Sequence, residues 1–337
     1  MISFWEYIDT CNEEKNEIIT GTKFLELKEQ ILTDYSSLIG QNLLTGLFMN
    51  FYFPLCIWIS DKTKTKGSPA VIGISGAQGT GKTTLTRICK SILTDYFRLN
   101  VAAISIDDFY LTRNERRELA EEVHPLFETR GVPGTHDTGM AIDLIRSLKT
   151  LKTDQTIKLP VFDKGADDRM PENCWKIVNG DLDVIIFEGW CVGARPQRGS
   201  ELIKPVNSLE SQQDKKCIWR KFVNNKLKNE YKSLFSEIDF LIYLCAPGFE
   251  KVYEWRVNQE KDLSAHLSGI EKNALMSDSE IKLFIMYYER LTKHMINTLP
   301  SISDITVYLN DNHLPGKFKV PAKNRSRLKL KNIRFLP

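Results

Sequence analysis

Short runs of consecutive apolar residues alternate along this chain with longer segments in which apolar residues recur every three or four positions. Such runs are typical of strands buried on both faces of a sheet, and the longer segments are typical of helices with one buried face. Because strands separated by helices pair in parallel through right-handed crossovers, the pattern predicts an α/β fold with a parallel central sheet. The runs that predict strands lie at 71–74, 101–105, 184–187, 240–244 and 305–309.

Helical segments separate and flank these strands. Ser277 and Glu280 have the spacing of a capping box, which predicts the start of a long helix that Pro300 ends. The stretch 195–216 is polar and contains Pro and Gly, so it is expected to be a mobile insertion. Before the first strand, a helical extension is expected over residues 1–67, with the lysines of residues 62–66 in a solvated loop. The other helices are expected near 22–38, 41–52, 112–124, 138–151, 217–235 and 249–260.

The motif G-x-x-x-x-G-K-[ST] follows the first predicted strand and precedes a predicted helix, which is the context in which it binds phosphate. Its glycines let backbone N–H groups surround phosphate oxygens, and the helix N-terminus adds its positive dipole end. Lys82 brings a positive charge to the outer phosphates, and the Thr83 hydroxyl can ligate Mg²⁺. The motif therefore predicts a P-loop NTPase domain, a three-layer sandwich that binds a nucleoside triphosphate and Mg²⁺. ATP is the expected nucleotide, and the preference over other triphosphates stays open. The residues predicted to hold the nucleotide are Gly76, Ala77, Gln78, Gly79, Thr80, Gly81, Lys82, Thr83 and Thr84.

Composition narrows the class of protein. With 42% hydrophobic and 26% charged residues among 337, the chain is ordinary for a globular protein, and its net charge of +3 gives no reason to expect a nucleic-acid partner. The seven cysteines are scattered without a C-x-x-C pair, which suits a reducing compartment, so a cytoplasmic location is expected. The five histidines lack the spacing of a transition-metal site. The number of subunits stays open.

The segment between Asp34 and Asp61 carries no charged residue, as a membrane span would. However, its interior holds Gln41, Asn50 and Pro54, and its apolar residues repeat with helical spacing, as in a helix with one buried face. It is therefore expected to pack on the domain, with no membrane partner. The first residues include acids and lack a basic region before an apolar run, so no signal peptide is expected.

Two predicted strands end in carboxylates, at the edge of the sheet where α/β proteins bind ligands. Asp107 follows the second strand and is the candidate general base for an acceptor hydroxyl, with an N-cap or loop role as the alternative. Its neighbour Asp108 is ambiguous, because side chains alternate and only one of the two can face the crevice. Glu188 follows the third strand and is predicted to help Thr83 hold Mg²⁺.

Arg256 lies on a predicted helix that leads into residues 262–276, a segment expected to act as a lid. As this segment closed, the guanidinium could reach the phosphates and stabilise the transition state. The alternative is an exposed arginine on a helix surface. Arg256 is therefore a candidate catalytic residue together with Lys82 and Asp107.

Cationic residues in two irregular loops favour a small anionic acceptor. Arg130, His136, Lys164 and Arg169 come from loops that converge on the nucleotide end of the predicted sheet, and arginine can bind a carboxylate through two hydrogen bonds. A nucleoside would instead need aromatic stacking. Tyr110 and nearby aromatic residues leave that open, although such residues are also typical of core packing.

Acids in the same loops also have two readings. Asp137 fits the N-cap of the helix over 138–151, and Asp163 can pair with neighbouring cations rather than touch a substrate. With these alternatives open, the predicted substrate-binding residues are Asp107, Tyr110, Arg130, His136, Asp137, Asp163, Lys164 and Arg169.

Three classes of P-loop protein are compatible with the phosphate loop: a small-molecule kinase, a switch GTPase and a non-catalytic ATP-binding regulatory protein. A switch GTPase needs a base-reading N-K-x-D motif, which the chain lacks. A kinase accounts for the strand-end carboxylates and the loop cations together. Within kinases, a nucleoside or pantothenate-type acceptor is the alternative to a hydroxy acid.

The order of motifs resembles a known group of kinases. SIDDFYLT after the second strand and FEGW after the third are similar to segments of uridine kinase, pantothenate kinase and phosphoribulokinase, which implies that Asp107 is the catalytic base. RGVPGTHD, LPVFDKGADDRMP, FEGWCVG and WRVNQE more closely resemble the D-glycerate 3-kinase family, over about residues 50–314. This resemblance implies conversion of D-glycerate and ATP to 3-phosphoglycerate and ADP with Mg²⁺. The kinase domain is thus expected over 68–314, and a basic tail over 315–337.

Overall fold

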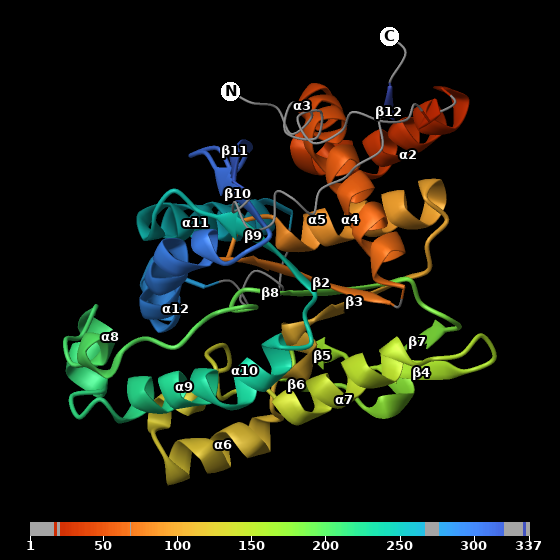
Figure 1. Cartoon of the computed structure of the whole chain (residues 1–337). Coiled ribbons are helices and arrows are strands. Elements are labelled where there is room, and N and C mark those ends of the chain that lie inside the picture. Colours follow the sequence, from red (N-terminus) through yellow and green to blue (C-terminus); the bar gives the residue numbers. More distant parts are fainter. Residues whose placement is uncertain (1–16, 19–20, 68, 267–275, 320–332, 335–337) are drawn as a thin grey trace.

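A six-stranded sheet in the order β11-β10-β9-β2-β8-β3 runs through the computed structural model, which describes residues 17–18, 21–67, 69–266, 276–319 and 333–334 (Figure 1). Every strand except β11 pairs in parallel and covers a predicted apolar run, so the predicted α/β fold is confirmed. β11 pairs antiparallel with β10, so the boundary expected after residue 314 falls inside a β-hairpin. The strands are β2 (Ala70–Gly76), β3 (Val101–Ser105), β8 (Val184–Gly189), β9 (Phe240–Cys245), β10 (Ile305–Leu309) and β11 (Pro315–Lys319).

Two layers of helices cover the sheet, because alternate side chains of each strand point to opposite faces. From β2, Ile72 and Ile74 join a cluster with α4 and α5, whereas Val71 joins the opposite cluster with α7 and α10. These layers lie above and below the sheet in Figure 1. The helices are α2 (Gly21–Ile39), α3 (Gln41–Leu47), α4 (Phe53–Lys66), α5 (Lys82–Ser91), α6 (Arg113–Glu122), α7 (Thr138–Lys149), α8 (Ser208–Gln213), α9 (Ile218–Lys228), α10 (Glu230–Phe235), α11 (Phe249–His266) and α12 (Asp278–Thr298).

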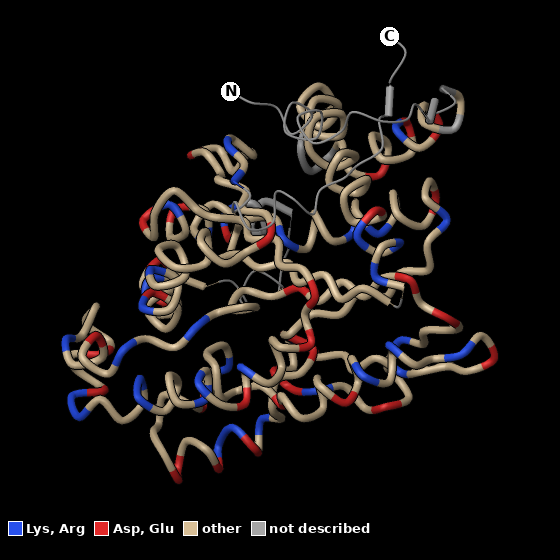
Figure 2. The backbone as a smooth tube through the Cα atoms, viewed as in Figure 1, with Lys and Arg blue, Asp and Glu red and all other residues tan. Residues whose placement is uncertain are grey.

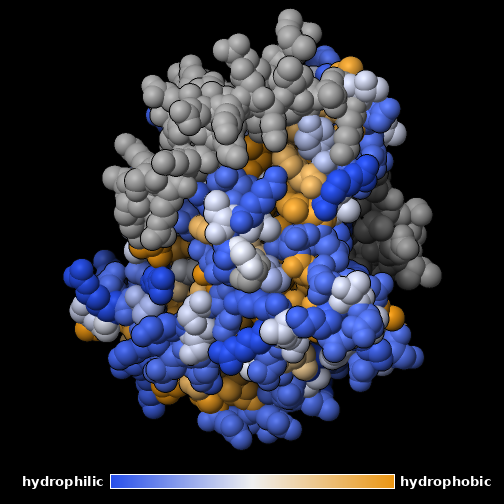
Figure 3. All heavy atoms as spheres, turned by 45° about the vertical axis from the view of Figure 1, so that its right-hand side comes forward, coloured by the Kyte–Doolittle hydropathy of each residue, from blue (hydrophilic) through white to orange (hydrophobic). Residues whose placement is uncertain are grey.

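Small strand pairs lie outside the main sheet: β4 (Thr156–Leu159) with β7 (Lys176–Asn179), β5 (Phe162–Asp163) with β6 (Asp168–Arg169), and β1 (Glu17–Ile18) with β12 (Ile333–Arg334). Charges of both signs are interspersed along the chain (Figure 2). Hydrophilic side chains cover most of the face shown in Figure 3, with hydrophobic ones in smaller patches between them. The residues of the basic tail beyond 319 lie outside the described part of the chain, apart from β12.

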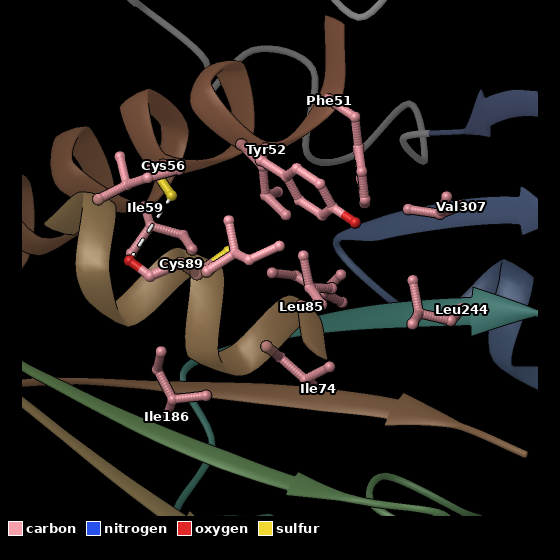
Figure 4. Packing of buried hydrophobic residues seen from close by; sticks show 14 of the residues in the cluster. Phe51, Tyr52, Cys56, Ile59, Ile74, Leu85, Cys89, Ile186, Leu244 and Val307 are labelled. Atoms are coloured by element: carbon pink, nitrogen blue, oxygen red, sulfur yellow. Dashed lines mark hydrogen bonds between the residues drawn. The ribbon is translucent and has the colours of Figure 1, made fainter. Parts of the chain in front are cut away.

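The hydrophobic core crosses the boundary expected at residue 67. Phe48 and Phe53 are fully buried and belong to the same cluster as Ile74 of the central strand. Figure 4 shows Tyr52 and Cys56 packed over α5 and the sheet. The helical run Gln41–Lys66 is long and apolar enough to cross a membrane, but 67% of its most apolar window is buried inside the protein. The N-terminal helices are therefore part of the core around the sheet.

The helix expected over 41–52 continues to Lys66 as α3, a π-helical turn (Phe48–Tyr52) and α4. Pro54 lacks an N–H, and its ring would crowd the carbonyl of Asn50. The wider π turn lies where this conflict would arise, so the helix passes through the proline. The solvated loop expected over 62–66 was wrong, because these residues form the last part of α4 and Lys62 is buried. Lys66 pairs with Asp239, which also accepts from the Val71 backbone N–H of β2.

Residues 195–216 were expected to be mobile, and the structure instead anchors them through buried charges. Arg290 of α12 contacts Glu210 at 2.6 Å, and the Glu210 side chain is fully buried. Arg290 also donates to the backbone carbonyls of Glu201 and Lys204. A second pair, Arg220 with Asp214, lies 2.7 Å apart nearby. Neither pair was predicted, because the partners are distant in sequence or belong to separate helices.

We expect Arg290→Met to destabilise the protein strongly. The change removes the closest charged partner of the buried Glu210 carboxylate and leaves the Arg220 guanidinium 4.0 Å away. Breaking a buried pair costs about 3–5 kcal/mol. Arg146→Met is the matched control, because Arg146 is 63% exposed and its pair with Glu237 should be worth less than about 1 kcal/mol. Urea unfolding of both variants measures the difference. Equal free energies of unfolding would show that Arg290 does not anchor the segment.

Candidate active site

The phosphate loop connects the end of β2 to the start of α5, as the motif predicted. Gly79 and Gly81 have φ values of +76° and +83°, in the left-handed region that side chains disfavour. A Cβ on Gly79 would also lie 2.9 Å from Cβ of Trp255 in α11. Within the loop, the Thr80 hydroxyl donates to the Ala77 carbonyl at 2.8 Å. The loop thus has the tight backbone that phosphate binding requires.

Lys82, the first residue of α5, lines the same pocket as the acidic side chains of Glu188 and Asp107. Its ammonium donates to the Ala77 carbonyl at 3.0 Å. Burial lowers the pKa of Lys82 below its ordinary value, although Glu188 and Asp107 oppose this shift. Both carboxylates are therefore close enough to act on the same ammonium group, where a phosphate chain would lie.

Glu188 and Thr83 meet beside the phosphate loop. The Thr83 hydroxyl donates to Oε1 of Glu188 at 3.2 Å, and burial raises the pKa of Glu188, opposed by Lys82. A hydroxyl and a carboxylate side by side are oxygen donors of the kind that Mg²⁺ prefers. Among the described residues, no group of three or more His, Cys, Asp and Glu could hold a metal by itself. This donor set therefore fits a Mg²⁺ ion that takes its other ligands from phosphate and water.

Asp107 lies in a 3₁₀ turn (Ile106–Phe109) directly after β3. It lines one pocket together with the phosphate loop and Glu188. Its Oδ2 atom is 2.7 Å from the Lys164 ammonium. Burial is the largest single influence on the pKa of Asp107 and raises it, but the neighbouring groups, Lys164 foremost, together hold this pKa below its ordinary value. Asp108 accepts instead from the Phe162 backbone N–H at 3.3 Å. The structure thus decides the ambiguity between the two acids in favour of Asp107.

A single pocket of about 1090 Å³ joins these groups. Its lining includes the phosphate loop, Glu188 and residues that follow β10, such as His313. Asp107, Tyr110, Arg130 and Lys164 also line it, and we call the lining around these four residues the acceptor part. The pocket is thus large enough for a nucleotide and a small acceptor side by side. Of the predicted substrate-binding residues, these four line it.

The other predicted substrate-binding residues do not line the pocket and contact other parts of the protein instead. They are His136, Asp137, Asp163 and Arg169. His136 stacks on Tyr110 with ring centroids 4.4 Å apart, and its Nδ1 lies 2.6 Å from the Tyr231 hydroxyl. Burial lowers the pKa of His136 to about 4, so at neutral pH it is not the cation that the sequence suggested. It holds Tyr110 in place instead.

Three further predicted contacts with substrate are also local supports. Asp137 accepts from the Met140 backbone N–H at 2.8 Å and caps α7, the alternative left open from the sequence. Asp163 accepts from the backbone N–H groups of Gly165 and Ala166, which closes a turn. Arg169 donates to the Tyr110 carbonyl at 2.9 Å. None of these three side chains lines the pocket. The two acids bind backbone N–H groups two or three residues away, whereas Arg169 binds the backbone of a residue 59 positions away.

Arg256 lines the pocket from α11, next to the phosphate loop. Its guanidinium pairs with Glu260 at 2.6 Å, one helical turn later, and lies over the Phe284 ring. Residues 267–275 of the expected lid lie outside the described part of the chain, so a movement of Arg256 toward the phosphates stays a prediction.

Two pocket aromatic residues were not assigned to the site from the sequence. The Trp190 indole donates to the Gly131 carbonyl at 2.8 Å and meets the Tyr288 ring edge-on, with centroids 4.8 Å apart. Both residues line the acceptor part of the pocket. Trp190 directly follows a strand end, which is a usable signal, whereas Tyr288 lies in α12 and only the fold brings it here.

Comparisons with known proteins agree with this geometry. The sequence profile of the Phosphoribulokinase / Uridine kinase family matches residues 71–194. The uncharacterized kinase mug58 of Schizosaccharomyces pombe is 36% identical over 241 residues, which cover 68% of this chain and 82% of the relative. The chloroplastic D-glycerate 3-kinase of Arabidopsis thaliana is 32% identical over 276 residues, which cover 76% of this chain and 57% of that protein.

A solved structure extends the likeness to the fold. A D-glycerate 3-kinase from Cryptococcus neoformans var. grubii matches with a TM-score of 0.63 and 24% identity, covering 79% of this chain and 96% of the other. The resemblance to kinases of this group, drawn from the sequence motifs, is confirmed by these matches. The chain therefore belongs to the phosphoribulokinase/uridine kinase family, and it is a P-loop kinase, a phosphotransferase with an alcohol group as acceptor.

Proposed function

We propose that this kinase transfers the γ-phosphoryl group of ATP to D-glycerate, with Mg²⁺, and forms 3-phosphoglycerate and ADP. The observation that carries the proposal is the pairing of a base with cations: Asp107 lies 2.7 Å from Lys164, and Arg130 lines the same part of the pocket. A hydroxy acid needs both a base for its hydroxyl and cations for its carboxylate. The named activity of the Arabidopsis relative supports the same acceptor.

The transfer follows from these positions. The oxygen of the acceptor hydroxyl forms a bond to the γ-phosphorus, the bond from that phosphorus to the β,γ-bridging oxygen breaks, and ADP departs. The hydroxyl proton passes to the Asp107 carboxylate. Lys82 and the backbone N–H groups of the phosphate loop stabilise the charge that develops on the phosphoryl oxygens. The Trp190 and Tyr288 rings line the acceptor part of the pocket.

Thr83 and Glu188 would hold the Mg²⁺ ion. When bound, the ion neutralises charge on the phosphates and orients them for in-line transfer. The Thr83–Glu188 contact of 3.2 Å brings the two oxygen donors together before any ion binds.

A panel of acceptors tests the proposal. ADP release is measured with D-glycerate, L-glycerate, glycerol, pantothenate and uridine at one ATP and Mg²⁺ concentration. We expect D-glycerate to give the highest kcat/KM, because glycerol and uridine lack its carboxylate, pantothenate is larger, and L-glycerate has the opposite configuration at the carbon that bears the 2-hydroxyl. Preference for uridine or pantothenate would replace the acceptor and keep the kinase. ATP binding without turnover on any acceptor would favour a regulatory protein.

The Glu188→Gln variant tests the magnesium site. We expect the Mg²⁺ concentration for half-maximal rate to rise by at least about tenfold, since losing even an outer partner of a metal costs 10–100-fold in affinity. Glu172→Gln is the control, because Glu172 is 67% exposed and pairs with Lys158 outside the pocket. A Mg²⁺ titration of the rate compares the two. An unchanged midpoint for Glu188→Gln would exclude Glu188 as a ligand.

A further inference from the structure

The Lys164 side chain covers the carboxylate that should act as the general base. Its Nζ atom is 2.7 Å from Oδ2 of Asp107, and both residues line the pocket. A carboxylate that is paired with an ammonium group accepts a proton less readily than a free one, because the ammonium stabilises its charged form. In this arrangement the base is therefore not ready to accept a hydroxyl proton.

The backbone of Lys164 is fixed, whereas its side chain can change partners. Arg130 donates to the Lys164 carbonyl at 3.2 Å, and Arg130 is itself held by an ion pair with Asp167 and by the Phe162 ring, 5.5 Å from its guanidinium. The turn closed by Asp163 spans residues 163–166 and so includes Lys164. By contrast, the Lys164 side chain is 63% exposed, and a lysine on four flexible carbons can turn toward a new anion at little cost.

The Arg130 side chain, unlike that of Lys164, is held in place by several partners. Asp167 is also bound by Arg116, whose side chain is fully buried and lies 2.5 Å from it. The two arginines and Asp167 thus form a fixed group beside the acceptor part of the pocket. Lys164 is the cation in this wall whose ammonium contacts the base itself.

We propose that Lys164 keeps Asp107 covered until the carboxylate of the acceptor draws the ammonium away, so that Lys164 selects acceptors that carry a carboxylate. The inference rests on the proposed function. Exchanging one carboxylate for another costs the lysine little. Water or a neutral alcohol offers no replacement charge, and the Asp107–Lys164 pair must break without compensation. Lys164 is thus a specificity-determining residue that also suppresses transfer to water.

The Lys164→Met variant separates this role from a simple contribution to catalysis. ADP release is measured without acceptor, with glycerol and with D-glycerate. With the base uncovered, we expect the first two rates to rise by up to about fivefold, the worth of an exposed ion pair. The kcat/KM for D-glycerate should fall about 10–100-fold, because a charge-assisted hydrogen bond is lost. Lys158→Met, an exposed lysine paired with Glu172, is the matched control and should change none of the three.

Two further variants keep the test decisive. Lys164→Arg retains the positive charge and should therefore retain the suppression of ATP hydrolysis. It also provides a variant that can be assayed if Lys164→Met does not fold. In the double variant Asp107→Asn/Lys164→Met, the gained hydrolysis should disappear, because it acts through Asp107. A fall in all three rates of Lys164→Met, or no change in any, overturns the inference. If the parent protein does not accept D-glycerate, the proposed function fails, and hydrolysis without acceptor still decides whether Lys164 covers the base.

Discussion

The Asp107→Asn variant should bind ATP like the parent protein and transfer the phosphoryl group about 10²–10⁴-fold more slowly, the usual contribution of a general base. Asparagine has nearly the same size as aspartate but cannot accept the hydroxyl proton. The residue follows β3 and is not part of the phosphate loop, so nucleotide binding should persist. Calorimetry with ATP and coupled detection of ADP measure the two properties separately.

Asp108→Asn is the matched control. Asp108 is the next residue in the same turn, but its carboxylate accepts from the Phe162 backbone N–H instead of lining the pocket. It should therefore retain most of the transfer rate. Equal losses in the two variants would mean that the turn as a whole matters rather than the Asp107 carboxylate, and an unaffected rate in Asp107→Asn would remove it as the base.

The second large effect is expected for Lys82→Met. Methionine keeps the length of the side chain and removes the charge that would contact the outer phosphates, which should lower kcat by about 10²–10³-fold, as loss of one preorganised donor does. Binding of ATP should also weaken. Lys90→Met, at the exposed end of the same helix, controls for a change of charge on α5. Steady-state rates at saturating ATP and Mg²⁺ decide the case, and a kcat within the range of the control would contradict the assigned role.

The local elements were predictable because their signals are short in range. β3 and β10 occupy the predicted runs Val101–Ser105 and Ile305–Leu309. The capping box of Ser277 and Glu280 begins α12 as expected. The strands depend on hydrophobic runs, and the start of the helix depends on a hydrogen bond between near neighbours. Both signals are visible in the order of residues.

The candidate site was predictable only in part, for the same reason. The phosphate loop and the strand-end acids Asp107 and Glu188 could be found, since the carboxyl ends of parallel strands meet at one edge of a sheet. The loop residues were harder. His136 and Arg169 have the same chemistry as Arg130 and Lys164 in the sequence, but the fold turns the first two toward the protein and the last two toward the pocket.

By itself, the order of residues determined the α/β class, the phosphate loop and the kinase family, because these depend on hydrophobic periodicity and on motifs of fixed spacing. Tertiary structure alone decided which charged side chains line the pocket and which are held by partners elsewhere in the protein. It buried α4 in the core, closed β11 onto β10 and paired Arg290 with Glu210. It also set Lys164 against Asp107, 57 residues apart in sequence. Such contacts depend on which side chains face one another across the folded chain, and no local pattern records that.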